Sequence, residues 1–525
     1  MPKQQQYPAG DSKLPASTSS LGFEQIEMLS PEITPPSRSG APRSGTVEEV
    51  AEIDEPLPLV PALRRFSKVA GYCLAMSVAI IGWGYDLVVV GSIVSVDSFL
   101  RDYGDLYEGD LIIPSSWLSL WLGLPPVGRT TLMIGSTISA VAVSFIFFSH
   151  LASDQTNRRV ILTVGLTVQG LSVGMIKTTA VTYVSENAPT CLRGPAMVLF
   201  PTFTLLGQLV GAIVVFVVNG VEGPTGYLGA FGSQWVLALA PFILACLMPE
   251  SPAYLVRKGY EERALKAATA LYAPKVDPRG ALVRIRAIIE EERAMKTEAS
   301  YRACFQGTNR RRTMIVLLAY AMPTLFGLDL LSNASYFLKT LGMPSGQALL
   351  TMIGGIVAGI LANAVGIWVA SRARRRRMAL LSLSATVALW TAMGASGFRP
   401  SGATPWLAAG LMVGVILVCG VGCWPASYVI AGETSALVLR APTQGLGGCV
   451  THVSSAAAAI ALPYIFNPDA GALGARSGLV YSGLCALALA ATWVGVPELQ
   501  GRSMLEIDHM FELRLATRKF GGWGR

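Results

Sequence analysis

Two carboxylates lie inside long apolar stretches of this sequence, where an ionisable side chain is costly. Asp86 lies in the run from Val69 to Val94, and Asp329 lies in the run from Met314 to Phe337. A charged group at such a depth faces the interior of a helix bundle by default and marks a pathway for an ion or a polar ligand. Both carboxylates are therefore candidate proton-coupling residues. For Asp86, an acid that only packs helices together is the alternative.

Asp329 also has an amide neighbour. Asn333 follows four residues later, which places the carboxylate and the amide on one helix face about one turn apart. A carboxylate in that position favours a cationic or strongly hydrogen-bond-donating ligand, or a second proton site. Asp329 and Asn333 are thus candidate substrate-binding residues.

The elements that must position these residues are apolar helices. The chain has 525 residues, of which 52% are hydrophobic and 14% charged, and its mean hydropathy is +0.49. This composition is too apolar for a soluble protein of that length. A helix that crosses the hydrocarbon of a bilayer needs about 20 mostly apolar residues, and such runs recur from residue 69 to residue 496. They do not alternate as the strands of a membrane barrel would, so the sequence predicts an all-α membrane protein.

We expect about twelve transmembrane helices. The spans are placed near residues 69–94, 111–127, 131–150, 160–183, 195–218, 229–247, 314–337, 348–370, 378–397, 406–431, 445–466 and 476–496, and the second is short and broken by proline. Lysine and arginine gather in alternate connecting segments, which by the positive-inside rule predicts that both termini are cytoplasmic. The net charge of +8 is accordingly attributed to basic residues that fix the membrane topology, and not to a surface that binds nucleic acid.

Composition also divides the chain into regions. Residues 1–62 are rich in Pro, Ser, Gln and Glu and are expected to form a disordered cytoplasmic tail. Residues 63–248 form a first half of six helices and residues 313–497 a second. Between them, residues 249–312 form a cytoplasmic loop whose periodic charges predict short amphipathic helices. Residues 498–525 form a cytoplasmic C-terminal tail.

The chain repeats itself. The segment ENAPTCLR, from Glu186 to Arg193, is matched 247 positions later by ETSALVLR, from Glu433 to Arg440. A second landmark, the Pro-Glu pair that follows the sixth and the twelfth apolar runs, gives an offset of 248 positions. Two halves in parallel repeat, with a site between them, are typical of transporters that rock one half against the other. The four charged residues are predicted to form a cytoplasmic gate. Anchors of helix ends are the alternative.

Several motifs are specific enough to indicate a family. They are GYD from Gly84, YVSENAPTCLRG from Tyr183, PESPAYLVRKGYEERALKAATALY from Pro249, YFLKTLGM from Tyr336, WPASYVIAGET from Trp424, LPYIFNPDAGALGARSG from Leu462 and PELQGRSMLEIDHMFE from Pro497. Together they resemble the sugar-porter branch of the major facilitator superfamily, and more narrowly its fungal maltose and alpha-glucoside permease-like group. The likeness covers about residues 64 to 515.

This resemblance implies the major facilitator fold, with two six-helix halves in pseudo-twofold repeat, and proton-coupled symport of a sugar or polyol. It implies that Asp86 accepts the proton. Gln208 resembles the glutamine of the fifth span that contacts sugar hydroxyls, and an amide that both donates and accepts suits such a ligand. Tyr336, Trp424 and Tyr428 match aromatic positions near the substrate site. Packing within the bundle is the alternative for each ring.

The sequence departs from the family pattern in three places. The seventh span lacks the glutamines of the family's QQxxGxN motif, and Asp329 replaces its Asn. The fourth span lacks an arginine that would pair with Asp86. Lys177 is the cation available there, and it either neutralises a carboxylate or extends toward the interface. Finally, the rest of the second span and the family's loop with GxxxDRxGRR are missing. Either the protein is a natural short form, or the gene model is shortened.

These observations favour one function class. We expect a proton-coupled transporter of a sugar or related polar small molecule, a monomer that spans a membrane several times, in the plasma membrane. Export of a specialised metabolite is one alternative, and a transport-inactive nutrient receptor or decayed paralogue is another. The sequence has no nucleophile elbow, phosphate-binding glycine loop or metal-ligand cluster, so we predict no enzyme activity, cofactor, metal or nucleic-acid partner. Its partners are then the substrate, protons and the lipid bilayer.

Overall fold

The structure of the protein is a computed structural model that describes residues 59–93, 96, 99, 102, 105–107, 110–112, 129–221, 223–296, 301–436, 439–500 and 504–522. Residues 49–525 form one compact unit, and everything below concerns that unit. The tail expected over residues 1–62 lies almost entirely outside the described residues.

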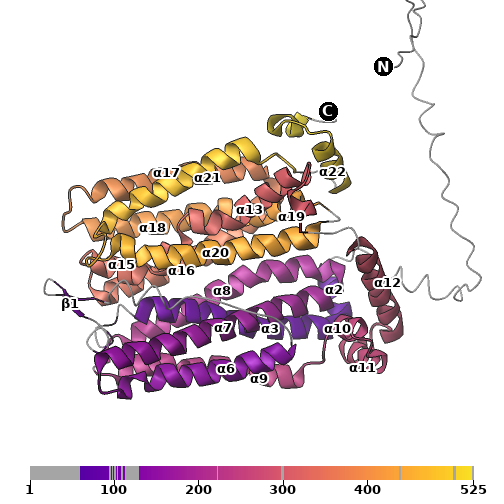
Figure 1. Cartoon of the computed structure of the whole chain (residues 1–525), viewed down its shortest axis with the longest axis horizontal. Coiled ribbons are helices and arrows are strands. Elements are labelled where there is room, and N and C mark those ends of the chain that lie inside the picture. The colour runs from indigo at the N-terminus through magenta and orange to yellow at the C-terminus, as the bar shows by residue number, and fades with distance from the viewer. Residues whose placement is uncertain are drawn as a thin grey trace, which may run out of the picture. The chain divides into compact units, whose positions relative to one another are not determined.

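The first half of the chain forms one group of helices, drawn in indigo to magenta (Figure 1). They are α2 (Leu59–Arg65), α3 (Ser67–Ile93), α6 (Arg129–Phe148), α7 (Gln155–Asn187), α8 (Thr190–Val218) and α9 (Thr225–Leu247). In this group α3 packs against α8, α7 and α9, and α6 packs against α7 and α9. A short antiparallel hairpin, β1 (Asp105–Tyr107) and β2 (Asp110–Ile112), places Leu106 opposite Leu111.

The second half forms a matching group, drawn in pink to yellow (Figure 1). Its helices are α13 (Asn309–Leu325), α14 (Leu328–Ser332), α15 (Ala334–Thr340), α16 (Ser345–Arg372), α17 (Arg375–Ser396), α18 (Thr404–Val421), α19 (Cys423–Thr434), α20 (Arg440–Phe466) and α21 (Ser477–Gly495). Here α17 packs against α21, α18 and α19, while α13 packs against α19 and α20.

Short helices gather at one end of the bundle. They are α10 (Pro252–Arg257), α11 (Glu261–Tyr272) and α12 (Pro278–Lys296) from the segment between the halves, and α22 (Met504–Glu512) after the last long helix (Figure 1). Helix α10 begins where the Ser251 side chain accepts a hydrogen bond from the Tyr254 N–H, with Pro252 as its first residue. Both features stabilise a helix start.

Eleven candidate spans, by length and composition, are found among the described residues. They correspond to the expected spans except the second, of which residues 111–112 lie in β2 and residues 113–127 lie outside the described residues. The start of that expected span was therefore wrong, because the backbone at residues 110–112 pairs as a strand. The helical architecture itself was predicted correctly.

Close backbone contact holds α3 against α8. A Cβ atom added to Gly84 would lie 2.1 Å from the Thr204 carbonyl oxygen, and one added to Gly207 would lie 2.1 Å from that of Ile81. Such reciprocal contacts are how membrane helices gain packing energy where lipid provides no hydrophobic driving force between them. Gly84 begins the GYD motif, and because Asp86 follows two residues later it lies on the opposite face of α3, toward α7 and α9.

One long span of the second half is broken near its middle. Between α13 and α14, Gly327 has a φ of 93°, a left-handed conformation that glycine adopts without strain. The carbonyls released there are satisfied by other helices, because Trp390 Nε1 donates to Phe326 O at 2.9 Å and Cys485 Sγ to Leu325 O at 3.3 Å. Such breaks are tolerated at membrane depth where protein covers them, and they are typical of substrate sites in transporters.

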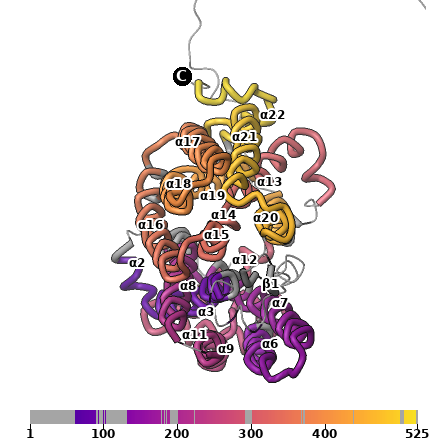
Figure 2. Tube along the Cα trace, turned by 90° about the vertical axis from the view of Figure 1, so that its left-hand side faces the viewer, coloured from indigo at the N-terminus to yellow at the C-terminus, as the bar shows by residue number. Residues whose placement is uncertain are grey.

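The largest apolar core cluster includes residues of both halves. Looking along the bundle, α8 and α3 of the first half face α16 and α15 of the second (Figure 2). The Ser92 hydroxyl of α3 lies 3.3 Å from the sulfur of Met352 on α16. The halves therefore meet through side chains of α3, α8, α15 and α16.

Candidate functional site

Asp86, in α3, accepts hydrogen bonds from two buried glutamines. Gln169 Nε2 of α7 donates to Oδ2 at 2.9 Å, and Gln234 Nε2 of α9 donates to Oδ1 at 2.9 Å. Within the part of the chain that the structure describes, Asp86 forms no ion pair. When ionised, its charge is thus held by neutral donors, which stabilise a carboxylate less than a cation would.

The two glutamines differ in how they are held. Gln169 Oε1 accepts from Ser139 Oγ at 3.0 Å, which fixes the orientation of that amide. Gln234 Oε1 is buried and has no hydrogen-bond partner among the described residues. Rotation of the Gln234 amide would present this oxygen to the O–H of a protonated Asp86. The site therefore has partners for the carboxyl group in both protonation states.

Sequence reasoning missed Gln169 and Gln234. The signal that could have found them is an isolated amide in the middle of an apolar run, since a polar group at that depth must find a partner inside the bundle. Gln169 lies in the fourth expected span, which has no arginine to pair with Asp86, and it donates to Asp86 instead.

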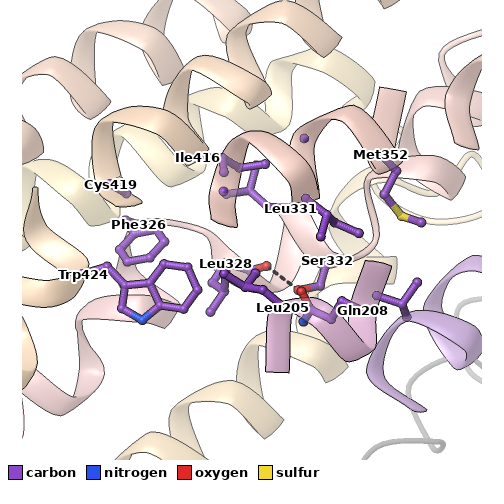
Figure 3. Close-up of a pocket in the computed structure, with 14 residues that line it drawn as sticks. Leu205, Gln208, Phe326, Leu328, Leu331, Ser332, Met352, Ile416, Cys419 and Trp424 are labelled. Carbon is purple, nitrogen blue, oxygen red and sulfur yellow. Dashed lines mark hydrogen bonds between the residues drawn. The ribbon is translucent and has the colours of Figure 1, made fainter. Parts of the chain in front are cut away.

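A cavity of about 40 Å³ lies between the halves, close to α14 and α19 (Figure 3). Its hydrogen-bonding side chains include Gln208 from α8 and Ser332 from α14, and its wider walls are apolar. Among those walls are Val88, Leu205, Phe326, Leu328, Leu331, Met352, Ile356, Ile416 and Trp424. The cavity is therefore small, and an organic ligand requires movement of its walls.

The structure places two of the predicted substrate-binding residues, Gln208 and Trp424, in the cavity wall. Tyr336 is buried, and its ring packs edge-on against Phe466 at a centroid distance of 5.9 Å. Tyr428 on α19 is 51% exposed. These two tyrosines are not among the residues that line this cavity, and their roles stay predictions.

Asp329 lies in α14, directly after the break at Gly327. Its Oδ1 accepts from Ser455 Oγ of α20 at 2.7 Å, while Oδ2 is buried and has no hydrogen-bond partner within the described ranges. The Asn333 amide donates to the backbone oxygen of Asp329 at 2.8 Å. Asn333 thus closes the short helix, and Asp329, like Asp86, is held by neutral donors.

Lys177 of α7 places its ammonium 3.5 Å from the centroid of the Trp83 ring. Such a cation–π contact is an alternative to pairing with an acid, and the structure pairs Lys177 with no carboxylate among the described residues.

Each of the two repeated acids pairs with an arginine of another helix. Glu186 accepts from Arg257 Nη1 of α10 at 2.9 Å and from Ser251 Oγ at 2.7 Å. Glu433 accepts from Arg375 Nη2 at 3.3 Å. Arg257 belongs to α10, in the segment between the halves, whereas Arg375 is the first residue of α17, so the two acids pair with arginines at different points of the repeat.

The arginines that the repeat singled out behave differently. The side chain of Arg193 lies outside the described residues, and Arg440 is exposed. The gate assigned to these four charged residues stays a prediction.

Comparison with known proteins gives a consistent picture. The sugar (and other) transporter family matches residues 109–511. The MFS transporter fmqE of Aspergillus fumigatus is 29% identical over 461 residues, which cover 83% of this chain and 85% of that protein. A maltose permease of Saccharomyces cerevisiae is 26% identical over 497 residues, covering 90% of this chain and 80% of the permease.

Solved structures agree on the fold. The xylose transporter XylE of E. coli, in a partially occluded inward-open conformation, superposes with a TM-score of 0.66 at 15% identity, covering 83% of this chain and all of XylE. The proton:xylose symporter XylE bound to 6-bromo-6-deoxy-D-glucose gives a TM-score of 0.60 at 17% identity, with 85% of this chain and all of XylE covered.

Proposed function

We propose that this chain, which belongs to the sugar (and other) transporter family, is a proton-coupled transporter that moves a small organic molecule across a membrane by alternating access. The observation that carries the proposal is Asp86, which lies inside the bundle between two neutral amide donors. A buried carboxylate without a cation gains little on ionisation, so it can be protonated and deprotonated within one transport cycle. XylE, which has a similar fold, is described as a proton:xylose symporter, and this supports the same mechanism.

The proton step follows from the contacts of Asp86. An ionised Asp86 accepts an N–H from each glutamine. Once Asp86 is protonated, its O–H must donate a hydrogen bond. Gln234 can supply the acceptor, because its side-chain amide can rotate without its Oε1 losing a hydrogen bond. Gln169 keeps its place because Ser139 holds its oxygen. Asp329, with its own unpaired oxygen, is proposed as a second proton-accepting residue in the other half.

The orientation follows from charge. Arg257, Arg311, Arg312 and the basic residues from Arg374 lie at or near the end of the bundle that carries α10 to α12 and α22. By the positive-inside rule this end faces the cytoplasm. With the cavity formed within one chain, we propose that the protein works as a monomer in the plasma membrane.

The test is proton movement in proteoliposomes that enclose a pH-sensitive dye. Maltose, glucose and a panel of aromatic alcohols are added outside. A neutral compound that leaks through the lipid moves no proton, so a change in internal pH reports coupled transport. We expect at least one compound to produce a change that Asp86→Asn abolishes. A pH change of the same size in Asp86→Asn contradicts the assignment, and no change with any compound favours the inactive receptor.

A further inference from the structure

The cavity between the halves has few groups that could recognise a sugar. Its hydrogen-bonding side chains include Gln208 and Ser332, and the Ser332 hydroxyl already donates to the Leu328 carbonyl at 3.0 Å (Figure 3). A sugar presents several hydroxyl groups, each of which must keep a hydrogen bond when it leaves water. A buried hydroxyl without a partner weakens binding by the full cost of its desolvation.

The apolar walls come from both halves. Leu205 belongs to the first half, while Leu331, Ile356 and Ile416 belong to the second. Small-molecule sites are largely apolar with a few polar groups that fix orientation. Here the amide of Gln208 offers one acceptor and two donors, and Trp424, which also lines the cavity, has a buried indole N–H without a hydrogen-bond partner among the described residues.

Two aromatic rings form one side of the cavity. Phe326 and Trp424 lie with ring centroids 6.1 Å apart and planes inclined by 57° (Figure 3). Offset or edge-on arrangements of aromatic rings at 4.5–7 Å are favourable, so a third ring from a ligand would find partners there. Met352, at the opposite side, has an unbranched and polarisable side chain that adapts to irregular apolar shapes.

We infer that the cargo is a compact, mainly apolar molecule with an aromatic ring and few hydrogen-bonding groups, held by the Phe326–Trp424 wall and oriented by the Gln208 amide. This deepens the proposed function and rests on it, since it names the class of molecule that this transporter carries.

The test is equilibrium binding to the full chain in lipid nanodiscs, measured by calorimetry with indole-3-ethanol, 2-phenylethanol, maltose and glucose. Indole-3-ethanol should bind at least about tenfold more tightly than maltose, because a sugar leaves hydroxyls unpaired in this cavity. Ile356→Ala, which removes apolar wall, should weaken indole-3-ethanol binding roughly tenfold. Val357→Ala is the matched control, because Val357 is the next residue of α16, is 41% exposed and does not line the cavity.

The outcomes separate this inference from the proposed function. Aromatic binding without proton movement upholds the cargo class and contradicts proton coupling. Maltose or glucose binding as tightly as the aromatic alcohols overturns the cargo class while leaving proton coupling open to its own test. A chain shown to be folded by its melting transition that binds no aromatic alcohol also overturns it.

Discussion

Asp86 shares its two oxygens between Gln169 and Gln234, and this sharing determines how the carboxyl group responds to pH. Amide N–H groups stabilise the ionised form modestly, while an adjacent cation stabilises it strongly. The pH range over which the transporter works is therefore expected to depend on which side chain stands at position 169.

Gln169→Arg places a cation beside Asp86 and should hold it ionised. A lower external pH is then required for protonation, so the pH of half-maximal proton movement should fall by roughly 1 to 3 pH units. The measurement is the pH profile of cargo-driven proton movement in proteoliposomes.

Gln169→Leu is the control of similar size without charge. It removes one donor to the carboxylate, so the half-maximal pH should move in the opposite direction. A shift of both variants in the same direction would show that position 169 acts through packing and not through charge.

At the scale of the helix, Gly327 makes the break that exposes Asp329 to α20. A Cβ atom at position 327 would meet the Tyr481 ring at 2.9 Å and the Trp390 ring at 3.0 Å, on a backbone with a φ of 93°. Gly327→Ala should therefore destabilise the second half by about 1–3 kcal/mol. The measurement is the thermal unfolding midpoint of the purified protein.

Gly354→Ala is the matched control, because a Cβ atom there meets nothing within 4 Å and the residue lies inside α16. Alanine is the better helix former, so this variant should be neutral or slightly stabilising. Equal loss of stability in both variants would contradict the role of the break.

The C-terminal helix α22 is anchored to the second half by arginines at the start of α13. Arg312 Nη2 lies 2.5 Å from Asp508 Oδ1, and its Nε donates to the Thr434 carbonyl at 2.8 Å. Arg312→Ala should leave Asp508 without its partner and destabilise the protein by roughly 3 kcal/mol, as expected for a mostly buried ion pair.

Arg310→Ala, two residues away at an exposed position, should change stability by less than about 0.5 kcal/mol. Limited proteolysis of the C-terminal tail, together with thermal unfolding, distinguishes the variants. A tail that stays protected in Arg312→Ala would show that the apolar contacts of α22 suffice.

The sequence alone predicted the transmembrane helices but not the contacts between side chains of different helices. Apolar runs identified the spans, because a helix that crosses the hydrocarbon of a bilayer needs about 20 mostly apolar residues. The break at Gly327 was not predicted, since a single glycine in an apolar run has no distinct signal until Trp390 and Tyr481 are placed against it. Likewise, the pairing of Glu186 with Arg257 depends on how α10 folds back on the first half.

At the scale of the whole molecule, alternating access requires that α3 and α16 separate or slide where the halves meet. Ser92 and Met352 touch across this contact, so the Ser92→Cys, Met352→Cys pair is the place to form a disulfide between the halves. Oxidation of that pair should block transport, and reduction should restore it, when proton movement is followed in proteoliposomes.

A second cysteine pair provides the control. Thr391 and Ser482 lie 2.7 Å apart within the second half, so a disulfide between Thr391→Cys and Ser482→Cys joins helices that move together. This variant should keep transport after oxidation. Full activity of the oxidised Ser92–Met352 pair, with the disulfide shown to be complete, would contradict rocking at this contact.

The central claim is that Asp86 takes up and releases the proton, and infrared difference spectroscopy during a pH titration tests it most directly. A protonated carboxyl group gives a C=O band that an ionised one lacks. We predict a band that grows as pH falls in the unmodified protein, is missing in Asp86→Asn, and appears at more acid pH in Gln169→Arg. A titration in Asp86→Asn that matches the unmodified protein throughout would contradict the account.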